Sequence, residues 1–167
     1  MRRGRRYDHL VLGRRYDEQD CSIARALEVV GERWTLLILR ESFLGTSRFD
    51  DFHHRLGIAR NVLQTRLERL VEEGVMERFP YQERPARYEY RLTQEGRDLL
   101  PVLIALLHWG DRHRAPAVGP RGAIAHAGCG GAINAALQCE SCGATVGARS
   151  IAVEVLREPL TPLAPRA

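Results

Sequence analysis

The 167-residue sequence contains no lysine, so all 25 of its basic residues are arginine. It also lacks a long apolar run, because the longest nearly uninterrupted stretch, Leu99–Leu107, is far shorter than the roughly 20 residues of a membrane-spanning helix. No apolar leader with a cleavage site follows the arginine-rich start. The four cysteines are unevenly spaced, which disfavours a disulfide scaffold. These absences argue against a membrane protein and a small secreted domain, and we expect a cytoplasmic protein.

The charge of the chain is almost balanced along its length. Hydrophobic residues make up 44% and charged residues 28%, as in a folded globular protein. The formal net charge is +4, and no segment is strongly basic. This pattern disfavours a non-specific polyanion binder and is compatible with a local cationic patch. The length fits one domain of about 100–150 residues with a small appendage, and it is too short for a typical barrel enzyme.

The middle of the chain combines helical periodicity with one hairpin pattern. Apolar residues recur at helical spacing in residues 21–30, 34–44 and 60–73, and Ser47 is positioned to cap a short helix ending near Gly57. Two strand-like segments, Val75–Tyr81 and Arg87–Leu92, flank a turn. Thr93 is expected to cap a long last helix that Pro101 bends. The predicted fold is mainly α with a small β-hairpin wing, which is the order of a winged helix-turn-helix.

The helix before the hairpin has the two faces that a helix in a DNA major groove needs. Leu63, Leu67, Leu70 and Val71 form an apolar stripe, which anchors one face. The opposite face carries the candidate base-contacting residues Arg60, Asn61, Gln64 and Thr65. Arginine pairs well with guanine, and asparagine or glutamine pairs well with adenine. The alternative is an ordinary solvated helix face.

Other arginines are candidates for contacts to the DNA backbone. Arg84 and Arg87 flank Pro85 at the wing, where they could reach phosphates or a minor groove, or could instead pair with Glu83 or Glu89. Arg48 lies at the start of the short helix, a position that suits a phosphate. Arg66 and Arg69 could contact phosphate or pair with neighbouring glutamates at positions 68, 72 and 73.

The remaining cysteines have metal-ligand spacing. His126-x2-Cys129 is followed by Cys139-x2-Cys142, and glycines follow both pairs. Two such pairs can close a tetrahedral, structural Zn²⁺ site, so residues 126–156 are predicted to form a small zinc ribbon with strands near 133–138 and 145–155. The alternatives are an iron–sulfur cluster, a Cys139–Cys142 disulfide, or a disordered segment with incidental cysteines.

The domain organisation follows from these patterns. We expect a basic N-terminal arm at 1–20, a DNA-binding and dimerisation domain at 21–113, a linker at 114–125, the zinc ribbon at 126–156 and a disordered proline-rich tail at 157–167.

The ordered series of motifs resembles the HxlR-type (DUF24) transcriptional regulators. The matching segments are Cys21–Ala24, Gly31–Arg40, Arg48–Phe52, Ile58–Leu70, Glu83–Thr93 and Gly96–Gly110. Ser22 stands where the family often has proline, and Tyr88 where it usually has a β-branched residue. The resemblance implies a bacterial, dimeric DNA-binding regulator whose first and last helices build the dimer interface.

The resemblance also gives Cys21 a candidate role, since several members of the family use a cysteine at this position as a redox switch. A helix N-terminus lowers the pKa of a thiol and so favours the reactive thiolate. The alternative is a small buried residue, which is a common fate of a lone cysteine.

We therefore expect a sequence-specific transcriptional regulator that binds double-stranded DNA as a homodimer at the nucleoid. Repression is the commoner outcome for this architecture, and the signal would be an oxidant or a small-molecule effector. The alternative is an interaction adaptor in which the zinc ribbon binds a protein and the winged helix is a docking module. An enzyme is not expected, because the sequence has no Ser/His/Asp ordering, no phosphate-binding glycine loop and no HExxH motif.

Overall fold

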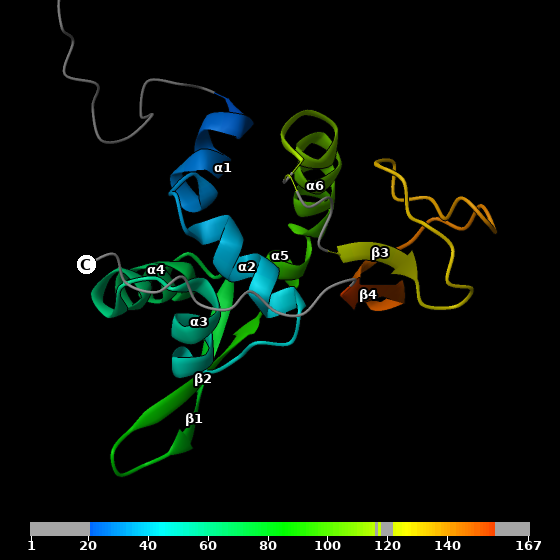
Figure 1. Cartoon of the computed structure of the whole chain (residues 1–167). Coiled ribbons are helices and arrows are strands. Elements are labelled where there is room, and N and C mark those ends of the chain that lie inside the picture. Colours follow the sequence, from blue (N-terminus) through cyan, green and yellow to red (C-terminus); the bar gives the residue numbers. More distant parts are fainter. Residues whose placement is uncertain (1–20, 116, 118–121, 156–167) are drawn as a thin grey trace, which may run out of the picture.

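The computed structural model describes residues 21–115, 117 and 122–155. The predicted arm at 1–20 and tail at 157–167 lie outside this part. This part of the chain forms six α-helices and two two-stranded antiparallel sheets, with a 3-10 helix, η1 (Ala148–Ser150), just before the last strand (Figure 1). In chain order they are α1 (Ser22–Val30), α2 (Thr35–Phe43), α3 (Phe49–Leu56), α4 (Arg60–Glu72), β1 (Met76–Gln82), β2 (Arg87–Leu92), α5 (Gln94–Arg97), α6 (Leu100–Arg114), β3 (Gly122–His126) and β4 (Ile151–Val155). None of the helices described is long and apolar enough to cross a membrane.

The apolar stripe of α4 anchors this helix in the main core. Leu63, Leu67 and Leu70 are fully buried, as the helical period predicts. They pack with buried residues of α2, α3 and the wing, among them Ile38, Leu39, Phe52, Met76 and Tyr90. The opposite face of α4 is therefore fixed toward solvent.

The wing is an antiparallel hairpin joined to the start of α3. Strand β1 pairs with β2 from Met76↔Leu92 to Pro80↔Tyr88, and the register shifts before Gln82. The backbone N–H of Tyr90 donates to the Ser47 carbonyl at 2.7 Å, and Arg48 forms an isolated bridge with Glu89. The expected Ser47 cap is wrong, because Arg48 is the N-cap residue of α3 and no side chain caps this helix. Ser47 belongs to the backbone pairing that holds the wing.

The last helix of the domain is not one bent helix, as the sequence suggested, but two. Thr93 caps α5 as expected, with its Oγ1 accepting from the Gly96 N–H at 3.1 Å. This helix ends at Arg97, and α6 begins at Leu100 with Pro101 in its first turn. The first turn has no intrahelical acceptor for an N–H, so proline fits there without cost. Pro101 therefore starts a helix and does not bend one.

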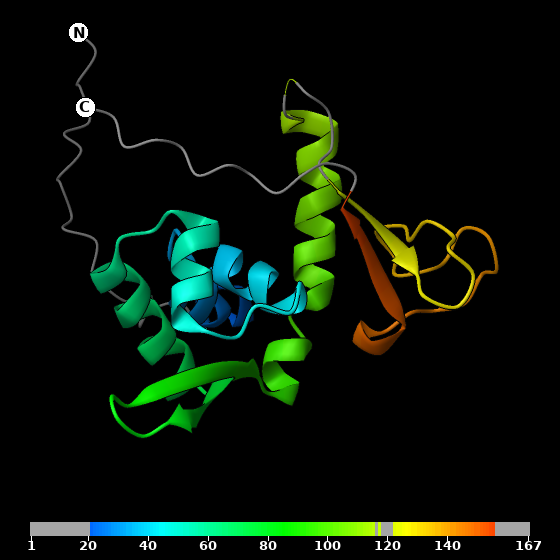
Figure 2. The same cartoon turned by 60° about the horizontal axis from the view of Figure 1, so that its bottom comes forward.

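The C-terminal segment is a second, smaller unit beyond α6 (Figure 2). Strands β3 and β4 pair antiparallel from Gly122↔Val155 to His126↔Ile151. The expected strand near 133–138 is wrong, because this stretch is a loop with isolated bridges at Ile133↔Cys139 and Gln138↔Thr145. Strand β3 instead begins inside the expected linker, in a run of glycine and alanine with little strand propensity.

Three helices followed by a hairpin on a shared core make the N-terminal unit a winged helix-turn-helix. In Figure 1 the wing projects beyond α3 and α4, whereas α1 and α6 stand at the opposite end.

Candidate nucleic-acid interface and metal centre

The exposed face of α4 gathers the four predicted base-contacting residues. Arg60, Asn61, Gln64 and Thr65 are all exposed. They occupy the N-terminal half of α4, the part of a recognition helix that contacts base edges. Gly57 precedes this helix in a left-handed conformation, with φ 61°, and so allows the tight turn between α3 and α4. We call these four residues the recognition face.

Arg60 is held in place by two residues of α3. Its guanidinium donates to Asp50 Oδ1 at 2.7 Å and lies 5.0 Å from the centre of the Phe49 ring. The hydrogen bond from Arg60 lowers the pKa of the Asp50 carboxyl below its ordinary value. One N–H group of the Arg60 guanidinium is therefore occupied by Asp50, while its other N–H donors remain available to a base or a phosphate. The sequence does not indicate Asp50 as a partner of Arg60, because this contact depends on how α3 and α4 pack.

The other members of the recognition face make contacts within α4. Thr65 Oγ1 donates to the Asn61 carbonyl at 3.0 Å, and the Gln64 amide donates to the Glu68 carboxylate. The Gln64 side-chain oxygen and the whole Asn61 amide are therefore the groups best placed to contact a base.

The wing arginines predicted to contact DNA are exposed at the tip of the hairpin. Neither Arg84 nor Arg87 forms a salt bridge within the part of the chain that the structure describes. Glu89, the alternative partner of Arg87, pairs with Arg91 at 2.9 Å and with Arg48 at 3.4 Å. The hydrogen bond from Arg91, followed by that from Arg48, lowers the pKa of the Glu89 carboxyl.

Arg48 joins α3 to the wing. In addition to the Glu89 contact, its guanidinium lies 4.6 Å from the centre of the Tyr81 ring. Two further pairs stiffen the hairpin, with Arg78 at 4.9 Å from Tyr88 and Arg91 at 5.0 Å from Phe79. These stacking pairs are not among the contacts predicted from the sequence, although arginines that alternate with aromatic residues along two adjoining strands indicate them.

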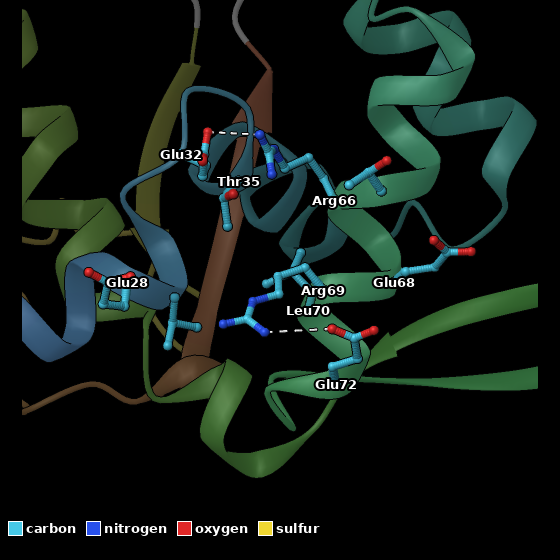
Figure 3. Close-up of a pocket in the computed structure, with 10 residues that line it drawn as sticks. Glu28, Glu32, Thr35, Arg66, Glu68, Arg69, Leu70 and Glu72 are labelled. Carbon is cyan, nitrogen blue, oxygen red and sulfur yellow. Dashed lines mark hydrogen bonds and ion pairs between the residues drawn. The ribbon is translucent and has the colours of Figure 1, made fainter. Parts of the chain in front are cut away.

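Arg66 and Arg69 line a hollow between α4 and the first two helices (Figure 3). Arg66 donates to Glu32 at 2.8 Å, and Arg69 pairs with Glu72 at 3.6 Å and with Glu73. Of the two alternatives for these arginines, the structure favours pairing with glutamate over a phosphate contact. The partner of Arg66 is Glu32 on the turn before α2, which sequence spacing alone did not indicate.

The four predicted metal ligands converge on one point. Each offers one donor atom, and these atoms lie within 4.8 Å of one another. Cys129 Sγ and Cys142 Sγ are each 3.4 Å from His126 Nδ1, and Cys129 Sγ is 3.3 Å from Cys139 Sγ. A tetrahedral zinc ion with bonds of about 2.0–2.3 Å separates its ligand atoms by about 3.5–3.8 Å. The three separations are slightly shorter than this, and a small outward movement of the side chains would bring the four donors to the spacing of such an ion. All four cysteines of the chain are free, so the Cys139–Cys142 disulfide is absent.

Two glycine turns shape this cluster. Gly130 and Gly143 follow Cys129 and Cys142 with φ of 69° and 70°. A Cβ on Gly131 would lie 2.6 Å from Cys139 Sγ, so only glycine fits beside this sulfur.

The backbone N–H of Cys142 holds the pKa of the Cys139 thiol at about 6, below its ordinary value of 9.0. The backbone thus favours the thiolate, which is the form that binds metal.

Substituting Gly131 by alanine is expected to lower the zinc content of the purified protein at least about tenfold, since the new methyl group overlaps Cys139 Sγ. The control is Gly147→Ala, because a Cβ there meets no atom within 4 Å. Elemental analysis of both variants checks this, and equal zinc in the two would contradict it.

His108 belongs to the contact between the two units and not to the metal cluster. Its Nε2–H donates to the carbonyl of Ile133 at 2.9 Å. This bond joins α6 to the loop that holds the cluster, a role that the sequence analysis did not foresee.

Cys21 lies immediately before α1 and is exposed. Backbone N–H groups of Ala24 and Ile23 lower the pKa of its thiol. The thiol is therefore open to solvent in the single chain, which favours a reactive thiol over the alternative of a small buried residue.

Comparisons with known proteins agree with this architecture. The sequence model of the HxlR-like helix-turn-helix family matches residues 29–117. The uncharacterized HTH-type transcriptional regulator Rv3095 of Mycobacterium tuberculosis is 47% identical over 133 residues, covering 80% of this chain and 84% of that protein. The crystal structure of PA1607, provisionally assigned as a transcription factor, has a TM-score of 0.65 at 36% identity and covers 80% of this chain and 94% of its own. The oxidised form of the redox regulator HypR has a TM-score of 0.53 at 29% identity, and the match covers 57% of this chain and 100% of the HypR chain.

The family match covers more than half of the chain, and it includes the core, the recognition face and the wing. This protein belongs to the HxlR-like helix-turn-helix family and is a DNA-binding transcriptional regulator, not an enzyme.

Proposed function

We propose that the protein binds a specific DNA sequence through the recognition face of α4, while the wing arginines contact the neighbouring sugar-phosphate backbone of the DNA. The observation that carries this proposal is the shared exposure of Arg60, Asn61, Gln64 and Thr65 on the half of α4 that can enter a major groove. Arg84 and Arg87 extend the same interface from the wing, where they suit phosphates or a minor groove.

The test is DNA selection with the purified full chain. We expect one enriched motif made of two related half-sites about 10 base pairs apart, or a multiple of this spacing. No enrichment over random duplexes would contradict sequence-specific binding and would favour the protein-interaction adaptor.

We further propose that the protein acts as a homodimer and represses transcription by covering its operator. Support comes from α1 and α6, which expose large apolar side chains at the end opposite the wing (Figure 1). Ile23 is 71% and Trp109 55% exposed, and Leu27, Val102 and Leu106 share this exposure. Burying such residues against a second copy would stabilise the pair and give two recognition helices for two half-sites. The proposal implies a cytoplasmic location at the bacterial nucleoid.

Substituting Leu106 by glutamate is expected to weaken self-association at least about a hundredfold, because an unpaired carboxylate would enter the apolar interface. Leu44→Glu is the matched control, since Leu44 is also an exposed leucine but lies at the end of α2. Sedimentation equilibrium measures both variants. A dimer that tolerates Leu106→Glu as well as Leu44→Glu would exclude α6 from the interface.

We propose that thiol oxidation at Cys21 is one effector signal. Its exposure and the N–H groups of α1 that favour its thiolate support this proposal. HypR, which is similar over the winged helix, is described as a redox regulator in reduced and oxidised forms.

The lowered pKa of Cys21 predicts the pH dependence of its reactivity. The thiolate is the reactive form, so alkylation by iodoacetamide should become half-maximal below the ordinary thiol pKa of 9.0. A peptide spanning residues 19–26 lacks the fixed helix N-terminus and serves as the reference. Identical pH profiles for Cys21 in the protein and in the peptide would show that α1 does not activate the thiol.

We propose that His126, Cys129, Cys139 and Cys142 hold a structural zinc ion. Four protein ligands leave no open position for a substrate, and an iron–sulfur cluster more often uses four cysteines. Elemental analysis after chelator-free purification should give about one zinc per chain. Less than about 0.2 zinc per chain would contradict the proposal.

A further inference from the structure

The three thiols of the candidate metal site differ in exposure. Cys129 and Cys142 are exposed, whereas Cys139 is only 1% exposed and packs with Ile133 and Val146. An oxidant in solution can therefore reach Cys129 directly, while Cys139 is shielded by the loop. The two sulfur atoms are 3.3 Å apart, so an S–S bond of about 2.05 Å needs them to approach by about 1.3 Å.

We propose that this site is also an oxidation site, at which a peroxide joins Cys129 and Cys139 in a disulfide and zinc is released. The proposal rests on the structural zinc proposed above. It concerns a different part of the molecule from Cys21, which lies before α1.

The chemistry needs one peroxide per site. The Cys129 thiolate attacks an oxygen of hydrogen peroxide, the O–O bond breaks, and the products are Cys129 sulfenic acid and, after one proton is taken up, water. The Cys139 thiolate then attacks the Cys129 sulfur, forms the S–S bond and displaces hydroxide, which takes a second proton to become water. The two thiolates lose two electrons in total, and the peroxide is reduced to two waters. Only His126 and Cys142 remain as donors, which is too few to hold the ion.

Loss of the metal would unfold this unit, because its own core is very small. Its buried cluster consists of Ile133, Cys139 and Val146, so one of its three buried members is itself a ligand. A segment of this size needs a metal or a disulfide framework to stay folded. The contact from His108 to the Ile133 carbonyl would be lost with the loop. Because His108 lies on α6, oxidation at the metal site would reach the helix proposed for dimerisation.

The experiment uses the full chain carrying Cys21→Ser, which leaves the three site thiols as the only cysteines. Zinc content is measured first, and hydrogen peroxide is then added while a chromogenic chelator, pyridylazoresorcinol, reports free zinc. Mass spectrometry maps the disulfides, and hydrogen exchange follows α6. We expect release of about one zinc per chain, a Cys129–Cys139 disulfide and faster exchange at the C-terminal half of α6, all reversed by dithiothreitol and zinc.

The outcomes separate the two proposals. A chain without zinc before oxidation would overturn both the zinc site and its oxidation. A chain that keeps its zinc in peroxide, or releases it without the Cys129–Cys139 disulfide, would overturn only the oxidation site. Unchanged exchange in α6 after release would overturn the further step, in which oxidation reaches α6 through the contact from His108 to Ile133.

Discussion

Replacing Asn61 and Gln64 together by alanine is expected to lower the affinity for the selected DNA sequence at least about 30-fold. Each well-placed side-chain contact to a base contributes about 1–3 kcal/mol of discrimination, and both amides stand on the exposed face of α4. Affinity for random duplexes should change little, since phosphate contacts by arginine carry that binding. The salt dependence should also stay the same, because no cation is removed. Fluorescence anisotropy with specific and random duplexes at several salt concentrations measures all three.

The matched control is Gln94→Ala on α5. Gln94 donates to Asp98 four residues later, as Gln64 donates to Glu68, so the control removes a similar helix contact away from the recognition face. It should leave DNA affinity within about twofold. Equal losses in the control and in the double variant, or equal losses on specific and random DNA, would contradict direct contact between these amides and bases.

The sequence predicted the recognition face because this face depends on one helix only. A buried stripe at Leu63, Leu67 and Leu70 fixes which side of α4 faces solvent, and the period of a helix then places Asn61 and Gln64. The wing was predictable for a similar reason, since alternation at Tyr88, Tyr90 and Leu92 specifies a strand.

The partners of the arginines were not predictable from the sequence. Arg60 pairs with Asp50, which is ten residues away on another helix, and Arg48 pairs with Glu89 across the join between α3 and the wing. Such contacts depend on how the elements pack, which local patterns do not contain. Pro101 shows the same limit, because a proline can bend a helix or begin one, and the packing of Leu99 and Leu103 against the core on either side of it is not contained in the local sequence.

The clustering of the four candidate metal ligands was predictable from the sequence, but the fold around them was not. The two-residue spacing within each pair places His126 close to Cys129, and Cys139 close to Cys142, for any conformation of the loop between the pairs. Strand β3 has glycine and alanine at three of its five positions and only Ile124 as a strong strand former, so its strand signal is weak, and the structure pairs it with β4.

Replacing Cys139 by serine is expected to remove the metal and unfold residues 122–155 while leaving the winged helix intact. Cys139 is both a ligand and a member of the small buried cluster, and structural zinc contributes about 10–16 kcal/mol in small zinc-dependent folds. The main core contains Ile38, Phe52 and Leu67 and shares no buried residue with the small cluster, so its stability should not depend on the ion. Zinc content below about 0.2 per chain and rapid hydrogen exchange confined to residues 122–155 and the end of α6 are the expected results.

Cys21→Ser is the matched control for this loss, since it removes a thiol that lies outside the metal site. It should keep about one zinc per chain and slow exchange in β3 and β4. Because the two variants make the same chemical change at different cysteines, a difference between them reports the position of the thiol and not the loss of a sulfur atom. Stoichiometric zinc in Cys139→Ser would contradict the four-ligand site. Unfolding of α2–α4 together with the ribbon would show instead that the C-terminal unit and the winged helix fold as one body, joined through contacts such as His108 to Ile133.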